Sequence, residues 1–189
     1  MSGLVLDHIE RIVTPRLLLR PVDSSDADAL FVLFADRDVI RWLSAPPWPY
    51  ARDDMDRFLA SITSDETPDR ENFLVIEMSG APIGGISWRM REASHLQAGS
   101  GPNIGYWLGR QYWGQGLMPE AVRGLVRELL ATNPADAVYS GAFAGNAQSL
   151  RVQAKLGFER TGMTRLRSNP QNADLPHINT RLLRTRFEA

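Results

Sequence analysis

The first third of the chain combines one short extended segment with three segments in which apolar residues recur at helical intervals. Residues 16–22, RLLLRPV, predict an opening strand. Residues 24–36 begin with serine and aspartate, which are favoured at helix N-termini, and predict a first helix. Residues 39–43 predict a second helix, which the proline cluster APPWPY ends, and residues 51–62 predict a third.

From residue 72 onward the spacing changes to that of strands. Residues 72–78 and 81–90 are rich in strand-forming residues, and the intervening Ser79 and Gly80 predict a hairpin. Strands are then predicted at 104–109, 137–143, 158–166 and 177–187, and helices at 118–130 and 147–156. This order predicts an α/β or α+β fold with a mixed sheet, and we expect residues 1–189 to form a single domain because no linker or repeat interrupts them.

The composition is that of a globular protein and excludes several classes. Apolar residues make up 43% of the chain and charged residues 23%, and there is no cysteine, which excludes a disulfide framework and a cysteine nucleophile. The N-terminus is acidic, unlike a signal peptide, and no apolar run reaches the roughly 20 residues needed to cross a bilayer. We therefore expect a cytoplasmic protein with no membrane partner.

The charge is small in total but unevenly distributed. A net charge of −1 argues against a nucleic-acid-binding face. Residues 1–100 carry 10 arginines and 16 acidic residues, net −6, whereas residues 101–189 carry 11 basic and 6 acidic residues, net +5. If the two halves form different sides of one cleft, the later half favours an anion and the earlier half a cation. The alternative is that these charges are scattered and solvated.

A glycine-containing turn joins a predicted strand to a predicted helix. The sequence QYWGQG, residues 111–116, follows the strand that ends near Leu108, and the helix begins around Leu117 with Pro119 in its first turn. Free amides at a helix N-terminus bind anions, and glycines let a phosphate approach the backbone. The turn lacks the Gly-Lys-Ser/Thr of a P-loop, and Pro119 stands where a dinucleotide motif has its third glycine. It predicts a phosphate cradle, the alternative being a turn without a ligand.

A second stretch, residues 145–158 with the sequence GNAQSLRVQAKLGF, predicts a helix with one polar stripe. Asn146 is a favoured N-cap residue. Asn146, Ser149 and Gln153 are spaced i, i+3 and i+7, which places them on the same side of the helix. This stripe either faces a ligand or consists of a capping asparagine with a serine and a glutamine in solvent.

Taken together, these segments resemble the GNAT-family N-acetyltransferases, specifically the RimJ/RimL-type branch of ribosomal-protein N-terminal acetyltransferases. Three segments carry the resemblance: TPRLLLRPVDSSDADAL, NIGYWLGRQYWGQGLMPEA and NAQSLRVQAKLGF. The resemblance implies the GNAT fold, a central mixed, mostly antiparallel twisted sheet of about seven strands with helices on both faces. It also implies acetyl-CoA as cosubstrate, no metal, and an amine as acceptor.

The same resemblance implies where acetyl-CoA binds. The pyrophosphate would be held by the turn and its backbone amides, at Gln111, Gly114, Gln115, Gly116, Leu117 and Met118. Asn146 would bond the pantetheine arm where the strand at 104–108 diverges from the strand at 137–143. Ser149 would lie near the thioester sulfur and donate a proton to it, and the backbone amide near Leu108 would polarise the thioester carbonyl.

The proton acceptor is where the chain departs from its relatives. Some relatives have a glutamate six residues before the motif asparagine and a tyrosine seven residues after it, and here these positions are Ser140 and Gln153. Glu77 and Glu92 are candidates to reach in from other strands. A protein α-amine, with a pKa of about 7.7–8.0, is already partly neutral near pH 7.4, whereas a lysine, at about 10.4, is almost fully charged. The missing carboxylate therefore favours an α-amine acceptor.

Two functions remain open at this point. The first is acetyl transfer to a protein N-terminus or a small amine, and the second is a non-catalytic acyl-CoA-binding module, which the departures at Ser140 and Gln153 keep open. Acceptor recognition in this family lies in variable loops, here residues 44–52 and 168–176. Dimers are common among relatives, so a homodimer is also an option.

Histidines and aromatic residues are the remaining candidates. His8, His95 and His177 show no metal-ligand spacing, and we expect them at the surface. Trp48, Trp88, Tyr106 and Trp107 could line an acceptor pocket, but large aromatic residues on strands usually pack in the core, so we expect most of them there, Tyr106 included, and Trp48, between prolines in a loop, in the pocket.

Overall fold

The computed structural model describes residues 9–63, 71–92 and 99–187. The strands in this part of the chain are β1 Ile12–Val13, β2 Leu18–Pro21, β3 Asn72–Met78, β4 Ala81–Arg91, β5 Gly101–Leu108, β6 Ala137–Phe143, β7 Glu159–Ser168 and β8 Ala173–Leu183. The helices are α1 Ala27–Phe34, α2 Arg37–Ile40, α3 Arg52–Thr63, α4 Leu117–Thr132, α5 Ala147–Lys155 and α6 Arg184–Phe187, with short 3-10 turns η1 Ser24–Asp26 and η2 Arg110–Tyr112.

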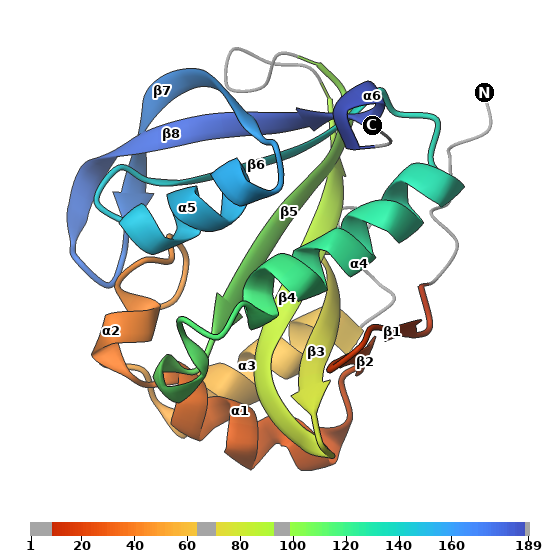
Figure 1. Ribbon diagram of the computed structural model, residues 1–189. Helices are drawn as coiled ribbons and strands as arrows, with labels where there is room; N and C mark the ends of the chain where they lie inside the picture. The colour runs from red at the N-terminus through yellow and green to blue at the C-terminus, as the bar shows by residue number, and fades with distance from the viewer. Residues whose placement is uncertain (1–8, 64–70, 93–98, 188–189) are drawn as a thin grey trace.

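The strands form a single sheet in the order β1-β2-β3-β4-β5-β6-β8-β7. Neighbouring strands are antiparallel except for β5 and β6, which are parallel. Helices α4 and α5 lie on one face of the sheet, in front in Figure 1, and α1 and α3 pack against the other face. The structure confirms the predicted mixed, mostly antiparallel sheet with helices on both faces, and the described residues contribute eight strands to it in place of about seven.

Two elements differ from the prediction. Strand β1 has only two residues, too few to show an alternating pattern in the sequence. The predicted final strand stops at Leu183, and the chain continues as the short helix α6. Arg184 explains the change, because its side chain donates to the carbonyls of Leu130 at 2.6 Å and Ala135 at 3.0 Å. These carbonyls belong to the end of α4 and the residues after it, so a long-range contact turns the chain away from the sheet.

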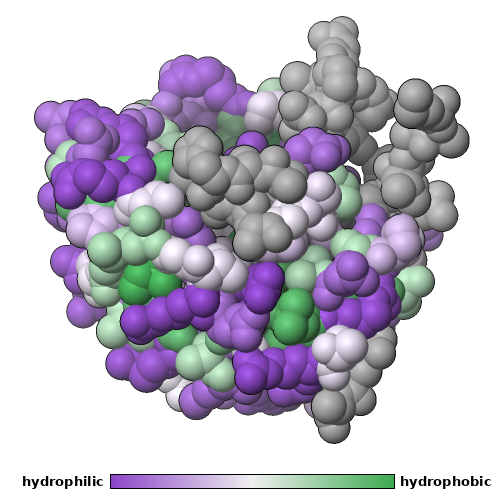
Figure 2. Space-filling model, turned by 90° about the horizontal axis from the view of Figure 1, so that it is seen from above, coloured by the Kyte–Doolittle hydropathy of each residue, from purple (hydrophilic) through white to green (hydrophobic). Residues whose placement is uncertain are grey.

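Each face of the sheet has its own hydrophobic core. On β3, Leu74 and Ile76 point into the core that contains Leu125 of α4, whereas Val75 between them belongs to a second core with Met55 of α3. On the face seen from above in Figure 2, hydrophilic side chains surround small, separate groups of hydrophobic ones. No helix in the described residues is long and apolar enough to cross a membrane.

Strands β5 and β6 are paired at one end only. Their parallel ladder is formed at Asn103 and Tyr139, and one residue further along each strand the Ser140 hydroxyl donates to the Ile104 carbonyl at 3.1 Å. Beyond this point the two strands diverge (Figure 1). The ends of β5 and β6, near Leu108 and Phe143, therefore lie on opposite sides of an opening in the sheet.

Gly84 on β4 lets the end of β5 pack closely. A Cβ at this position would lie 2.3 Å from the Trp107 carbonyl oxygen and 2.9 Å from Leu108 Cα. Because these are backbone atoms, they cannot move away without shifting β5. We expect Gly84→Ala to reduce the free energy of unfolding by about 1–3 kcal/mol, as overpacking does.

Thermal and denaturant unfolding test this expectation, with Gly162→Ala as the control. Gly162 also lies in a strand, but a Cβ there meets no atom within 4 Å. The control should keep the wild-type Tm. Equal losses of stability in the two variants would show that the contact with β5 is not the cause.

Candidate active site

The glycine turn leaves the N-terminus of α4 open. Gly116 is the N-cap of this helix, and both Gly114 and Gly116 have a φ of 75°. A Cβ on Gly114 would meet no atom within 4 Å, so the space in front of the turn is free. The amides of the first helical turn have no acceptor within the helix. A left-handed backbone, open space and free amides fit a phosphate group.

Arg16 and Glu120 hold this turn in place. The Arg16 side chain donates from Nε to Glu120 Oε2 at 2.7 Å and from Nη1 to the Gln115 carbonyl at 3.0 Å. The Thr14 hydroxyl donates to Glu120 Oε1 at 2.6 Å. The Arg16 guanidinium lies 3.6 Å from the place of a Cβ on Gly116, but its charge is paired with the Glu120 carboxylate, so its part is to hold the turn. No pattern in the sequence indicated this role, although Arg16 belongs to the first segment that carries the resemblance.

The two glutamines of the turn are bonded to each other. The Gln115 side-chain amide donates to the Gln111 carbonyl at 3.0 Å. Neither residue is among those that line the cleft, whereas Gly114, Gly116 and Met118 are. Gln111 and Gln115 therefore stabilise the turn on the side away from the cleft. Their neighbours Gly114, Gly116 and Met118 line the cleft.

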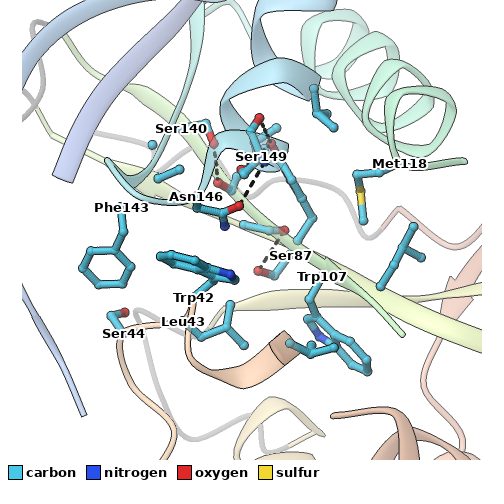
Figure 3. A pocket seen from close by; sticks show the side chains of 18 of the residues that line it. Trp42, Leu43, Ser44, Ser87, Trp107, Met118, Ser140, Phe143, Asn146 and Ser149 are labelled. Carbon is cyan, nitrogen blue, oxygen red and sulfur yellow. Dashed lines mark hydrogen bonds between the residues drawn. The ribbon is translucent and has the colours of Figure 1, made fainter. Parts of the chain in front are cut away.

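The opening between β5 and β6 continues from the turn as a cleft of about 850 Å³. Leu117 and Met118 line its glycine-turn end, and Leu108, Asn146 and Ser149 line its middle. Figure 3 shows Met118 on one side of the pocket and Trp42, Ser44 and Phe143 on the other, with Asn146 and Ser149 between them. The structure thus brings most of the predicted site residues together in one cleft.

The end of β5 presents a backbone amide to this cleft. The Gly109 amide donates to the Ile83 carbonyl at 2.9 Å, and antiparallel strands alternate hydrogen-bonded and non-hydrogen-bonded pairs. The next pair, Gly84 and Leu108, is therefore a non-hydrogen-bonded pair. The Leu108 N–H and C=O then point away from β4, toward the opening. Trp113 Nε1 donates to the Leu108 carbonyl at 2.9 Å. The Leu108 N–H faces the cleft.

Asn146 and Ser149 make contacts that stabilise the start of α5, and they also line the cleft. The Asn146 side chain accepts from the Ser149 amide at 3.1 Å and caps α5, as predicted, and both residues also line the cleft. The Ser149 hydroxyl lies 3.0 Å from the Tyr106 hydroxyl and accepts from the Gln153 amide nitrogen at 3.3 Å. Gln153 is only 2% exposed, so the alternative of a solvent-facing glutamine is wrong.

The positions that hold glutamate and tyrosine in some relatives form a neutral, buried network here. The Thr180 hydroxyl donates to Gln153 Oε1 at 2.8 Å, and Gln153 Nε2 donates to the Ser140 hydroxyl at 3.4 Å. Tyr106, which we assigned to the core, brings its hydroxyl into the cleft beside Ser149. Burial raises the pKa of Tyr106, although its bonds to Ser149 and Gln153 act against this, so the phenol keeps its proton at neutral pH.

The carboxylates predicted as proton acceptors lie elsewhere. Glu77 accepts from Arg20 Nε at 2.6 Å, and Glu92 accepts from the Ser100 hydroxyl at 3.3 Å. Neither lines the cleft. Glu71 does line it and accepts from the Ser87 hydroxyl at 2.5 Å. No pattern in the sequence distinguishes Glu71, because only the pairing of β3 with β4 brings it to this position.

The aromatic lining also differs from the prediction. Trp48 is 36% exposed, lies under the Arg37 guanidinium and does not line the cleft. Trp42 lines it instead, because Gly145, which lacks a side chain, allows the indole to pack against the loop before α5. Trp107 lines the cleft on the side of β5 (Figure 3).

The two loops expected to recognise the acceptor are joined to each other. The Asn169 amide donates to the Ser44 carbonyl at 2.9 Å, and the Asn169 side chain donates to the Ala45 carbonyl at 2.8 Å. The second loop is shorter than predicted, because β8 begins at Ala173. Ser44 and Ala45 of the first loop line the end of the cleft opposite the glycine turn, whereas the second loop lies behind them and does not line it.

The histidines give a mixed outcome. His177 is half-buried, packs against Gly141 and Phe143 of β6 and lines the cleft, so it is less exposed than expected. His8 and His95 lie outside the described residues. Among residues 9–63, 71–92 and 99–187, no group of three His, Cys, Asp or Glu side chains could hold a metal ion.

Comparison with known proteins identifies the family. Residues 16–159 match the family model described as acetyltransferase (GNAT) domain. A relative from Bacillus licheniformis, named uncharacterized N-acetyltransferase p20, is 27% identical over 160 residues, which cover 83% of this chain and 86% of that protein. The chain belongs to the GNAT acetyltransferase family, whose general reaction moves an acetyl group from acetyl-CoA to an amine.

Solved structures share the fold. RimJ of Mycobacterium smegmatis in complex with CoA-disulfide matches with a TM-score of 0.76 and 19% identity, over 92% of this chain and 84% of that one. The microcin C7 self-immunity acetyltransferase MccE, in complex with acetyl-CoA and AMP, matches with a TM-score of 0.75 and 17% identity, over 90% and 93%. At these identities the two matches show the shared fold.

The bond network of Glu120 makes stability depend on pH. Desolvation raises the pKa of Glu120, but the bonds from Thr14 and from the Arg16 amide and guanidinium outweigh it and hold this pKa below its usual range. The ionised carboxylate therefore stabilises the fold fully above the unfolded pKa of about 4.3, and this contribution is lost as the pH falls through the lower folded value.

We expect Glu120→Gln to lower the Tm at pH 7, with the difference from wild type shrinking below about pH 4. Thermal unfolding between pH 7 and pH 3 measures this difference. A difference that stays constant over the whole range would show that the charge of Glu120 does not contribute.

Proposed function

We propose that this protein transfers the acetyl group of acetyl-CoA directly to a primary amine, with both substrates bound in the cleft between β5 and β6. The observation that carries this proposal is the continuity of the cleft, because the open N-terminus of α4 and the hydroxyls of Ser149 and Tyr106 line the same space. One end fits an anionic group, and the middle holds a proton donor. No covalent enzyme intermediate is required.

The phosphate end would hold the pyrophosphate of acetyl-CoA. The amides of Gln115, Gly116, Leu117 and Met118 would donate to it, and the glycines at 114 and 116 leave room for it. Arg16, paired with Glu120, fixes the turn through its bond to the Gln115 carbonyl. Asn146 Oδ1 is already bonded to the Ser149 amide, so its side-chain nitrogen remains to donate to the pantetheine arm.

Acetyl-CoA, when bound, supplies the activated thioester and a thiolate leaving group. The Leu108 N–H faces the opening and would polarise the carbonyl. A serine hydroxyl has one proton and two lone pairs. Gln153 donates to one lone pair of Ser149, and when Tyr106 donates to the other, the serine proton is free for the sulfur.

The acceptor would be a primary amine, and the site favours an α-amine at a protein N-terminus or on a small molecule. About a fifth to a third of an α-amine is neutral near pH 7.4, compared with about 0.1% of a lysine amine. Trp42, Leu43 and Phe143 line the end of the cleft opposite the glycine turn, so an apolar group beside the amine would find complementary contacts.

Thiol release tests the function directly. The protein has no cysteine, so a thiol reagent reports only free CoA. We would mix the protein with acetyl-CoA and with peptides of different N-termini, amino acids, polyamines and aminoglycosides. Amine-dependent release supports the proposal. Tight CoA binding without release for any amine would instead indicate a non-catalytic acyl-CoA-binding module.

The phosphate cradle predicts a specific loss of affinity. We expect Gly116→Val to weaken CoA binding at least about 10-fold, because it places a branched side chain against the phosphates and strains a left-handed backbone. Gly80→Val is the matched control, since Gly80 has a φ of 82° but lies in the β3–β4 turn. Calorimetric Kd values should separate the two, and equal CoA affinity in both would remove the turn from the site.

The proposed role of Ser149 as proton donor predicts a loss of turnover without a loss of CoA affinity. We expect Ser149→Ala to lower kcat about 100-fold while leaving the Kd for CoA within a few-fold of wild type, because it removes only the proton directed at the sulfur. Tyr106→Phe should show a smaller loss of the same kind. Steady-state kinetics together with calorimetry measure this, and normal turnover in Ser149→Ala would exclude the serine from the mechanism.

A further inference from the structure

His177 is a cleft residue without a part in the scheme above. It lies on β8 opposite Phe143 of β6. Beside it, the Ala144 amide donates to the Pro176 carbonyl at 2.8 Å, which ties this end of β8 to the loop that leads to Asn146. This end of β8 is therefore held beside the loop that leads to Asn146, and His177 and Asn146 line the same cleft.

A glycine on the neighbouring strand makes room for the ring. A Cβ on Gly141 would lie 2.3 Å from His177 Cε1 and 3.0 Å from His177 Nε2, so only a glycine allows the imidazole to lie against β6. The Phe143 ring contacts the imidazole edge to face, with centroids 5.6 Å apart. Glycine and phenylalanine together fix the ring in the cleft wall.

Asn179 determines which nitrogen carries the proton. His177 Nδ1 lies 3.0 Å from Asn179 Oδ1. An amide oxygen can only accept, so Nδ1 is the protonated nitrogen and Nε2 keeps a lone pair. Within the described residues, Nε2 has no hydrogen-bond partner of its own. This arrangement, a histidine oriented by a second polar side chain, is the one that general bases use.

The imidazole is neutral at physiological pH. Burial lowers the pKa of His177 below 6.5, and the bond to Asn179 only partly opposes this. The residues packed on it, Gly141 and Phe143 from β6 and Thr164 from β7, do not titrate. The titratable groups of the neighbouring strands that line the same cleft are Tyr139 and Arg165, and neither shifts this pKa.

Glu71 is the rival proton acceptor. It lies across the opening from His177, beside β4, because the sheet order places β3 and β4 on one side of the opening and β8 on the other. Its carboxylate already accepts a short bond from the Ser87 hydroxyl. That bond occupies one lone pair of Oε1 and leaves Oε2 open, so Glu71 and His177 Nε2 both keep a free lone pair, and the variants below distinguish them.

We propose that His177 is the catalytic proton acceptor for the attacking amine and that Asn179 is its positioning residue. This proposal rests on the acetyl transfer proposed above. As the amine nitrogen bonds to the acetyl carbon and the carbon–sulfur bond breaks, an N–H proton moves to Nε2 and the sulfur takes the proton of Ser149. His177 then returns its proton to water, and Ser149 regains one from water through Tyr106, so that protons balance.

The first test compares three proteins. His177→Gln keeps a polar side chain of similar reach, and we expect it to lower kcat about 100-fold to 10,000-fold with the Kd for CoA unchanged. The acid limb of its kcat profile at saturating amine, which reports groups in the bound complex and not the free amine, should disappear. Glu71→Gln should keep both the wild-type acid limb and a kcat within about 5-fold of wild type.

The second test does not depend on turnover. In the free protein, nitrogen NMR of labelled histidine should show a His177 pKa below 6.5 and the proton on Nδ1. Asn179→Asp places a carboxylate beside Nδ1 and should raise this pKa, and the acid limb of the rate profile, by about one unit or more. Met163→Glu is the matched control, because it adds the same charge at a side chain that is 70% exposed, and it should shift neither.

The outcomes separate the two proposals. If wild type is active and His177→Gln keeps its rate while Glu71→Gln loses it, the histidine assignment is overturned and acetyl transfer stands. A His177 pKa above 7, or a proton on Nε2, also overturns the assignment by itself. If wild type releases no CoA with any amine, the proposed function fails, and the role of His177 fails with it.

Discussion

The parting of β5 and β6 is the constraint on which the rest of the structure depends. Two parallel strands that pair at Asn103 and Tyr139 and then diverge leave main-chain groups facing each other across a space too wide for a hydrogen bond. The Ser140 hydroxyl and the Trp113 indole donate hydrogen bonds to two of these carbonyls, those of Ile104 and Leu108 respectively. The remaining groups, including the Leu108 amide, are available to a ligand.

Two separate cores hold this opening in place. Helices α4 and α5 pack on one face of the sheet and α1 and α3 on the other. Successive side chains of β3 point alternately into the two cores. Neither core can close the opening, because closing it would pull the strands out of their register with β4 and β8. The cleft is therefore a consequence of how the domain is packed, and it exists without a ligand.

The chemistry of the cleft compensates for what the chain lacks relative to some members of its family. Ser140 and Gln153 provide no charge, but they form a satisfied network with Thr180, so no buried polar group in this network is left unpaired. The hydroxyl of Tyr106 on β5 lies 3.0 Å from the Ser149 hydroxyl. An imidazole on β8 lines the same cleft. The departures in sequence thus do not by themselves indicate an inactive domain.

The sequence alone determined the features that depend on residues close together along the chain. The glycine turn at 111–116, the capping of α5 by Asn146 and nearly all helices and strands follow from local conformational preferences, and family resemblance added acetyl-CoA. Tertiary structure decided which distant side chains enter the cleft. Glu71 replaces Glu77 and Glu92, and Trp42 replaces Trp48, because strand register and packing between elements far apart in sequence set these positions. No local pattern records such contacts.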